Sequence, residues 1–284
     1  MTGLVLEGGA MRGLFTAGVL DVLMEQDIRL DGAIGVSAGA VFGCNYKSGQ
    51  IGRVLRYNTR HCRDWRYASF RSLLLTGDLF GEKFCYHDIP ETLDPFDKEA
   101  YRNNPMPFWC VCTDAETGEA VYHRCDDGGK GDLQWFRASA SMPLVSRVVE
   151  VGGRKLLDGG AADSIPLRAM EGLGYQRNVV ILTQPEGFVK QPNSLVPLMR
   201  RVLKQYPRLV DTMACRHEVY NETLAYIGQQ EKAGRCLVIR PPCKLDVKQV
   251  EKDPEKLRTV YQLGRTEAEK RLHDIRAFIG EEHE

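Results

Sequence analysis

The chain opens with two short apolar runs that are separated by a helix-like stretch. Residues 3–7, GLVLE, are typical of a buried strand, because a brief apolar run bounded by glycine favours that structure. Between 10 and 26, apolar residues recur at near-helical spacing. Residues 31–37, DGAIGVS, again indicate a strand, and 38–46 indicate a second helix. Strand, helix and strand in this order predict a βαβ unit with two parallel strands and a right-handed crossover.

The middle of the chain carries the pattern of several further strands. We predict them at 108–114, 119–124, 147–158 and 178–183. The sequence AETGE between the first two is typical of a hairpin turn. A second turn is expected within VGGRK, where Gly152 and Gly153 supply the positive φ that tight turns need.

Beyond residue 190 the pattern is mostly helical. SLVPLMRRVLKQY and LVDTMACRHEVYNETLAYIGQQ predict two helices, a strand is expected at 236–242, and a polar helix from about 254. We find no internal repeat and no low-complexity linker. The patterns together predict an α/β fold, in which a mainly parallel central sheet is covered by helices on both faces. We expect the last ninety-odd residues to pack on this same sheet.

Composition and charge exclude some classes of protein. The 284 residues are 43% hydrophobic and 27% charged, as in an ordinary globular protein. The formal net charge is zero, which argues against a nucleic-acid partner. No apolar run approaches 18 residues, and Glu7 and Arg12 interrupt the N-terminal apolar segment, so neither a spanning helix nor a signal peptide is predicted. We therefore expect a cytoplasmic protein.

The nine cysteines form no framework of disulfides or metal ligands. Their number is odd and their spacing irregular. Cys110 and Cys112 share one face of a predicted strand, yet no further cysteine or histidine stands at ligand spacing. We expect buried, reduced thiols and no metal site.

Two of the predicted strands end in glycine at the start of a helix. Neighbouring parallel strands bring their carboxyl ends to one edge of the sheet, about 5 Å apart, where ligands gather. Each helix that starts there offers unpaired backbone N–H groups. At the first junction, Gly8 and Gly9 let the backbone approach a ligand closely. Taken alone, this loop suits a phosphate cradle as well as an oxyanion hole.

The second junction, GVSAG, has the pattern of a nucleophile elbow. Ser37 would stand on a tight turn, and Gly35 and Gly39 would relieve the crowding around it. The alternative is a serine that merely caps a helix. A third strand ends at Asp158 before two glycines, which suits either a simple Asp-Gly turn or a base for a serine nucleophile.

The three motifs, taken in order, resemble the patatin-like phospholipase family. They are GGAMRG at 8–13, GVSAG at 35–39 and DGG at 158–160, with TDAETGE at 113–119 and ASASMP at 138–143 as similar intervening segments. The resemblance covers about the first 185 residues. It implies a three-layer catalytic domain over 1–185, followed by a mostly helical extension with one strand over 186–284.

The resemblance also implies roles for particular residues. Ser37 would be the nucleophile and Asp158 its base, in a dyad without histidine and without metal or cofactor. Backbone amides of Gly8, Gly9 and Ala10 would form the oxyanion hole, although Ala10 departs from a third glycine found in many relatives. The supporting motif residues are Arg12, Gly13, Gly35, Gly39, Gly159 and Gly160.

Two charged residues of the motifs carry further expectations. We expect Asp158 to be partly desolvated, because a carboxylate of ordinary pKa is a weak base at neutral pH. Arg12 would either face a substrate phosphate or serve as a packing or salt-bridging residue.

The leading functional hypothesis is a lipid acyl hydrolase acting on an ester of a phospholipid, lysophospholipid or glyceride. A transacylase of the same mechanism and a catalytically silent lipid-binding protein are the alternatives. A nucleotide-binding module, with GGAMRG as a degenerate glycine-rich fingerprint, would leave the other two motifs unexplained. The oligomeric state stays open.

Two other features admit functional interpretations. A histidine could complete a triad after Asp158 only if His217 or His273 took part, and both lie in helical patterns. A stripe of arginines could contact an anionic membrane surface or form a solvated or internally paired face. The interleaved Trp65, Tyr67 and Phe70 could insert at an interface or belong to the core. The stripe consists of Arg53, Arg56, Arg60, Arg63, Arg66 and Arg71.

Overall fold

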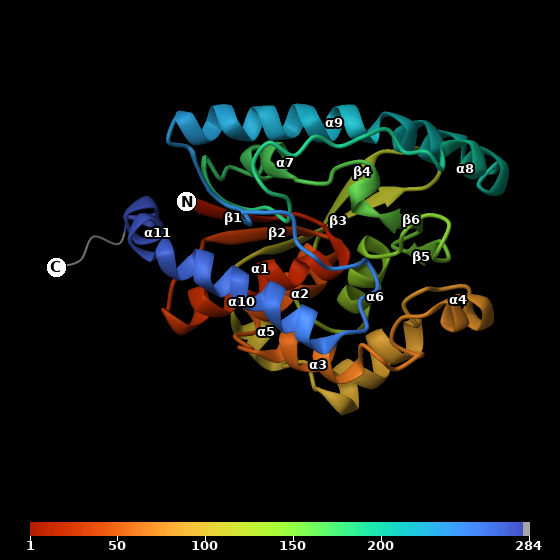
Figure 1. Cartoon of the computed structure of the whole chain (residues 1–284), viewed down its shortest axis with the longest axis horizontal. Coiled ribbons are helices and arrows are strands. Elements are labelled where there is room, and N and C mark those ends of the chain that lie inside the picture. The colour runs from red at the N-terminus through yellow and green to blue at the C-terminus, as the bar shows by residue number, and fades with distance from the viewer. Residues whose placement is uncertain (281–284) are drawn as a thin grey trace.

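A single mixed sheet organises the computed structural model, which describes residues 1–280 (Figure 1). Its strands are β1 (Thr2–Leu6), β2 (Gly32–Val36), β3 (Phe108–Asp114), β4 (Ala120–Arg124), β5 (Val149–Val151), β6 (Arg154–Asp158), β7 (Arg177–Ile181) and β8 (Cys236–Ile239). The order is β5-β6-β3-β2-β1-β7-β8, with β4 also paired to β3. Neighbours from β3 to β8 run parallel, and β4, β5 and β6 form antiparallel pairs. The predicted mainly parallel sheet is confirmed.

Helices cover both faces of the sheet, as predicted. They are α1 (Gly13–Glu25), α2 (Ala38–Lys47), α3 (Arg53–His61), α4 (Phe70–Thr76), α5 (Lys98–Asn103), α6 (Lys130–Ser139), α7 (Leu167–Gly172), α8 (Val196–Val202), α9 (Pro207–Lys232), α10 (Pro254–Lys270) and α11 (Leu272–Ile279). Alternate residues of β1 face opposite layers. Leu4 and Leu6 join the core beneath α1, α2 and α10, whereas Val5 packs in the core beneath α7 and α9 (Figure 1).

The predicted elements correspond closely to the observed ones. The region 147–158 divides into β5 and β6 at Gly152 and Gly153, whose φ values are 59° and 71°, as the turn prediction required. Helices α4, α5, α6 and α7 go beyond the sequence prediction. Two of them have only six residues, too few to establish a helical period. Among residues 1–280, no helix combines the length and the apolar character needed to cross a bilayer.

Strand β3 brings together the ends of two strands that are far apart in sequence. One edge of β3 pairs with β4 through Trp109–Thr113. The other edge therefore pairs first with β2 and then with β6, whose partners on β3 do not overlap. Val36 at the end of β2 is opposite Val111, and Asp158 at the end of β6 is opposite Cys112. Because β2 and β6 run toward each other along this edge, their last residues meet.

The C-terminal part of the chain continues the same sheet and covers both of its faces. Strand β8 pairs with β7 and ends at Ile239, before two prolines. Tyr220 and Ile227 of α9 enter the core on one face. On the other face, α10 crosses α1 so closely that a Cβ on Gly264 would lie 2.0 Å from the carbonyl oxygen of Phe15. Residues from both ends of the chain thus share one core.

Candidate active site

The turn between β2 and α2 holds Ser37 in an unusual backbone conformation. Its φ is 53° and its ψ is −122°, a region that non-glycine residues rarely adopt and that costs about 1–3 kcal/mol. Close backbone packing surrounds the turn. A Cβ on Gly35 would lie 2.5 Å from the carbonyl oxygen of Gly39, and one on Gly39 would lie 2.4 Å from that of Leu6. Both predicted elbow glycines therefore stand where a larger residue would collide with backbone.

Ser139, at the end of α6, joins this turn to the sheet. The Ser37 amide donates to Ser139 Oγ at 2.8 Å, and that hydroxyl donates to the Val111 carbonyl oxygen at 2.6 Å. Ser139 thus replaces the ladder bond that is lost where β2 ends. It lies inside the ASASMP segment, but sequence reasoning assigned it no role, because a serine that ends a helix has no distinctive spacing.

The side chains of Ser37 and Asp158 meet at the junction of β2 and β6. Ser37 Oγ donates to Asp158 Oδ2 at 2.8 Å, and the Gly160 amide donates to Oδ1 at 2.7 Å. Asp158 is only 8% exposed, and burial raises the pKa of its carboxyl. The hydrogen bond from Ser37, the charge of Arg216 and the Gly160 amide oppose that rise. The expected desolvation of Asp158 is confirmed.

The glycine loop after β1 lies against the Ser37 turn. A Cβ on Gly8 would lie 3.2 Å from Ser37 Cβ. The Gly8 amide donates weakly to the Ser164 carbonyl at 3.4 Å, whereas no acceptor for the amides of Gly9 and Ala10 occurs within residues 1–280. Ala10 has a φ of 47°, the left-handed region that glycine would adopt freely. Of the three amides predicted to bind an oxyanion, two have no other partner in the part of the chain that the structure describes.

The remaining predicted motif residues serve the packing of these turns. A Cβ on Gly159 would lie 2.2 Å from the Val111 carbonyl oxygen, so β6 can end close to β3. Gly13 lets the start of α1 approach α2, since its Cβ would be 2.8 Å from that of Ala38. Arg12 lines the cavity in front of Ser37.

Two cavities meet at Ser37, and they differ in chemistry. The first, about 100 Å³, is mainly apolar and has aromatic walls that include Phe42, Tyr57, Tyr86, Phe96 and Phe136. The second is about 680 Å³ and contains the charged side chains of Arg12, Asp158, Lys190 and Arg216. Ala10, Ser37 and Met142 line both. A molecule bound across Ser37 would therefore have an apolar part on one side and a polar part on the other.

The two histidines considered for a triad do not contact Asp158. His217 lines the polar cavity, but its Nδ1 lies 3.1 Å from the Ala214 carbonyl oxygen on its own helix. His273 is exposed on α11. Within residues 1–280, the side-chain partner of Ser37 Oγ is Asp158.

Glu7 is a buried acid behind the glycine loop that sequence reasoning did not assign to the site. Its two carboxylate oxygens accept from the Tyr220 hydroxyl at 2.6 Å and from the Thr183 amide at 2.5 Å. Tyr220 belongs to α9, so this hydrogen bond connects the C-terminal segment to the loop that precedes Ala10.

Much of the arginine stripe is internally paired. Arg53 is buried and donates to the Asp94 carbonyl oxygen at 2.7 Å. Arg56 pairs with the Asp94 carboxylate at 2.6 Å, and Arg66 with Asp64 at 2.7 Å. For these three arginines the paired interpretation is confirmed. Aromatic residues of the same region differ among themselves, because Tyr67 is buried whereas Phe70 is 84% exposed.

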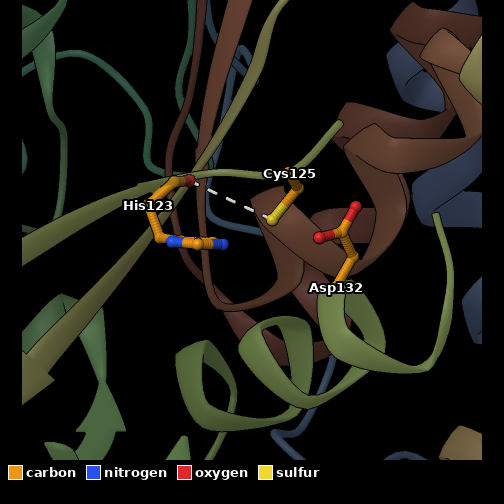
Figure 2. A group of neighbouring side chains, drawn as sticks. All are labelled: His123, Cys125 and Asp132. Carbon is orange, nitrogen blue, oxygen red and sulfur yellow. Dashed lines mark hydrogen bonds between the residues drawn. The ribbon is translucent and has the colours of Figure 1, made fainter. Parts of the chain in front are cut away.

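A group of possible metal ligands lies elsewhere in the molecule. Figure 2 shows His123, Cys125 and Asp132, whose ligand atoms lie within 4.8 Å of one another. The Asp132 carboxylate accepts from the Gly128 amide at 2.8 Å, and the His123 ring stacks on Trp135. The Cys125 amide donates to Phe108 at the start of β3, so the group stands at the opposite end of that strand from Asp158. It therefore lies apart from the contact between Ser37 and Asp158.

Comparison with known proteins adds two family models. One, described as a patatin-like phospholipase, matches residues 4–170, and one described as a domain of unknown function (DUF6363) matches 206–280. The uncharacterized protein YjjU of Escherichia coli is 26% identical over 273 residues, covering 92% of this chain and 74% of that protein.

Two eukaryotic relatives are matched over a smaller part of their length. The patatin-like phospholipase domain-containing protein ZK370.4 of Caenorhabditis elegans is 27% identical over 267 residues, which are 84% of this chain and 18% of that protein. Lysophospholipase nte1 of Aspergillus niger is 29% identical over 179 residues, which are 61% of this chain and 11% of that protein.

Proposed function

This chain belongs to the patatin-like phospholipase family, and we propose that it is a lipid acyl hydrolase that cleaves carboxylic esters through an acyl-serine intermediate. The observation that carries the proposal is the 2.8 Å hydrogen bond from Ser37 Oγ to Asp158 Oδ2, at the point where an apolar and a charged cavity meet. The similarity to lysophospholipase nte1 supports the same class of substrate.

In the first step, Ser37 Oγ attacks the ester carbonyl carbon while Asp158 Oδ2 takes the hydroxyl proton. The carbonyl oxygen becomes an oxyanion, and the free amides of Gly9 and Ala10 donate to it. The carbon–oxygen bond to the alcohol then breaks, and the proton on Asp158 passes to the departing alkoxide. This leaves an acyl group on Ser37.

In the second step, Asp158 takes a proton from water, and the resulting hydroxide attacks the acyl carbon. The tetrahedral intermediate uses the same two amides. As it collapses, Asp158 passes its proton to Ser37 Oγ, which restores the hydroxyl and releases the carboxylic acid. The apolar cavity accommodates the acyl chain, because burial of each methylene from water contributes about 0.8 kcal/mol. The alcohol part occupies the charged cavity.

A fluorophosphonate probe tests the nucleophile directly. We expect one probe adduct on Ser37 by mass spectrometry, and no adduct in Ser37→Ala. Hydrolysis of a lysophospholipid and of a monoacylglycerol should fall at least about 10³-fold in that variant. Ser194→Ala, at an exposed position, is the matched control and should retain both labelling and hydrolysis.

The base is tested with Asp158→Asn, which we expect to lower turnover by about 10²–10⁴-fold. Near-normal turnover in this variant, or labelling of another serine, would contradict the proposal. Addition of an acceptor alcohol separates hydrolysis from transacylation, because a transacylase would convert most of the acyl group to a new ester.

A further inference from the structure

The charged cavity holds three cationic side chains from separate parts of the chain. Arg12 follows the glycine loop, Lys190 lies between β7 and α8, and Arg216 belongs to α9. All three line the cavity with Ser37 and Asp158. Within residues 1–280, none of them forms an ion pair with a carboxylate at 4.0 Å or less. Charged groups that are withdrawn from water without a partner are costly, so three unpaired cations beside Ser37 indicate that the cavity binds an anion.

The two arginines retain unused donors. Arg12 Nε and Arg216 Nε are buried and have no hydrogen-bond partner among the described residues. Arg216 donates through Nη2 only to Ser164 Oγ, at a long 3.4 Å. A buried donor without an acceptor costs about 1–3 kcal/mol, so each needs an explanation. A tetrahedral oxyanion bound in the cavity would supply acceptors for both.

Helix α9 carries Arg216 and also contacts Lys190 and the residue before the glycine loop that leads to Arg12. Asn221 clamps the backbone of Lys190, accepting from its amide at 2.8 Å and donating to its carbonyl at 3.0 Å. The ammonium group of Lys190 lies 4.3 Å from the centre of the Tyr220 ring. Tyr220 in turn donates to Glu7, which lies just before the glycine loop. One helix therefore carries Arg216, holds Lys190 and is tied to the loop before Arg12.

The charges of the group act on one another. Burial, helped by the charges of Arg216 and Arg12 and opposed by that of Glu7, lowers the pKa of Lys190 to about 8. Burial also lowers the pKa of Arg216, although Asp158 opposes this. Three cations and one acid, Asp158, line the cavity, and a second acid, Glu7, is buried behind it, so the cavity carries a surplus of positive charge. An additional anion would relieve the repulsion among the cations.

We infer that Lys190 and Arg216, together with Arg12, form a phosphate-binding subsite that selects esters whose alcohol part carries an anionic phosphate. The inference rests on the proposed function, since it assumes that Ser37 attacks the ester. It assigns a role to the segment of unknown function, whose helix α9 supplies Arg216 and fixes Lys190. Guanidinium and ammonium groups suit phosphate oxygens, which accept several charge-assisted hydrogen bonds at once.

The test compares two substrates with the same acyl chain, a monoacylglycerol phosphate and a monoacylglycerol. The measured quantity is the ratio of kcat/KM for the phosphate ester to that for the neutral ester. We expect Lys190→Met and Arg216→Gln each to lower this ratio about 10–100-fold. The exposed Lys232→Met and Arg208→Gln, both on α9, are matched controls and should leave the ratio unchanged. A ratio that stays constant in Lys190→Met and Arg216→Gln overturns the inference, as does an equal loss for both substrates.

A binding experiment separates this inference from the proposed function. In Ser37→Ala protein, glycerol 3-phosphate and inorganic phosphate are titrated by calorimetry at pH 7 and pH 9. We expect the affinity to be lower at pH 9 than at pH 7, because Lys190 with a pKa of about 8 loses its charge there. In Ser37→Ala/Lys190→Met this difference in affinity between the two pH values should be absent. Binding through Arg216 in a wild-type protein that hydrolyses no ester would refute the hydrolase and retain the subsite. Hydrolysis of esters by a protein that binds no phosphate would refute the subsite and retain the hydrolase. Equal binding of inorganic phosphate and glycerol 3-phosphate would identify the free anion, not a lipid headgroup, as the ligand.

Discussion

At the residue scale, the site depends on two residues in strained backbone conformations. Ser37 and Ala10 have φ values of 53° and 47°, where side chains other than glycine are disfavoured. Ser37 needs its hydroxyl, so it cannot be glycine, and the surrounding hydrogen bonds hold it in place. The Ser139 hydroxyl accepts from the Ser37 amide, and the Asp158 carboxylate accepts from the Ser37 hydroxyl. Strain at the nucleophile is thus balanced by contacts from the end of one helix, α6, and the end of one distant strand, β6.

Replacement of Asp158 by asparagine should have opposite effects on activity and on the stability of the fold. Burial raises its pKa, so the ionised form needed for catalysis lowers the stability of the fold at neutral pH. Asp158→Asn removes that charge. Its Oδ1 can still accept from the Gly160 amide, and its Nδ2 can donate to Ser37 Oγ, which reverses the direction of that hydrogen bond. We expect its thermal midpoint at pH 7 to equal or exceed that of the wild type. The difference should disappear as the pH falls below about 4, where the unfolded aspartate also becomes protonated.

The same pKa predicts the acidic limb of the activity profile. Hydrolysis should fall as the pH drops through the raised pKa of Asp158, at a higher pH than an ordinary aspartate near 3.9 would give. Asp211→Asn, on the exposed side of α9, is the control and should change neither profile. A less stable Asp158→Asn protein at pH 7 would show that the buried charge is not a cost to the fold.

Sequence reasoning reached Ser37 and Asp158 because glycine marks the turns that carry them. The glycines at 35 and 39 are required by contacts within the elbow itself, and such local requirements leave a spacing that can be recognised. Ser139 and Arg216 leave no recognisable spacing in the sequence. Each is brought to the site by an element that packs against the sheet, and their side chains are common in helices of any function. Tertiary contacts of this kind are not encoded in a motif.

At the element scale, α4 exposes several large apolar side chains. Phe70, Leu74 and Leu75 are 84%, 87% and 60% exposed, and the Arg71 guanidinium lies 4.4 Å from the centre of the Trp65 ring. Tyr67 and Phe80, which flank α4 in sequence, line the apolar cavity. We propose that α4 inserts its apolar side chains into a lipid surface and so brings the cavity to its substrate.

The double variant Phe70→Ser/Leu74→Ser tests this proposal. Full burial of each side chain contributes about 1.5–3 kcal/mol, so binding to phosphatidylcholine/phosphatidylglycerol vesicles should weaken at least about tenfold. Hydrolysis of a soluble short-chain ester should stay within about twofold, because neither residue lines the two cavities that meet at Ser37. Leu173→Ser/Val219→Ser, at exposed positions on the opposite layer, is the matched control. Unchanged sedimentation of the first variant with vesicles would exclude α4 as the contact.

The meeting of β2 and β6 also belongs to this scale, and the sequence could not predict it. The hairpin turns at 115–119 and 152–153 were recognisable, since their residues favour turns. The pairing of β6 with the free end of β3 depends on the length of β2, which leaves that edge unoccupied beyond Val111. Strand lengths are set by tertiary packing, and they were predicted only to within a few residues.

At the scale of the whole molecule, the two ends of the chain are packed together. Strand β8 extends the sheet beside β7, and α10 lies across α1. The crossing is close because glycines face the opposite backbone on both helices. A Cβ on Gly18 would lie 2.1 Å from the Tyr261 carbonyl oxygen, and one on Gly264 would lie 2.0 Å from that of Phe15. We propose that 1–185 and 186–284 fold as a single cooperative unit.

The distribution of tryptophan allows a direct test of that unit. All three tryptophans, Trp65, Trp109 and Trp135, lie before residue 186, so their fluorescence reports only the first part of the chain. Gly264→Ala alters only the second part. Its Cβ would force α10 away from α1, and we expect a destabilisation of about 2–3 kcal/mol, or roughly 4–12 °C in Tm. If the two parts fold together, the unfolding transition seen by tryptophan fluorescence must shift to the same lower temperature, as a single step.

Gly228→Ala in α9 is the matched control, because a Cβ there meets nothing within 4 Å and should leave Tm equal or slightly higher. A tryptophan transition that does not move in Gly264→Ala, while circular dichroism reveals a second and earlier step, would mean that the C-terminal segment is a separate domain.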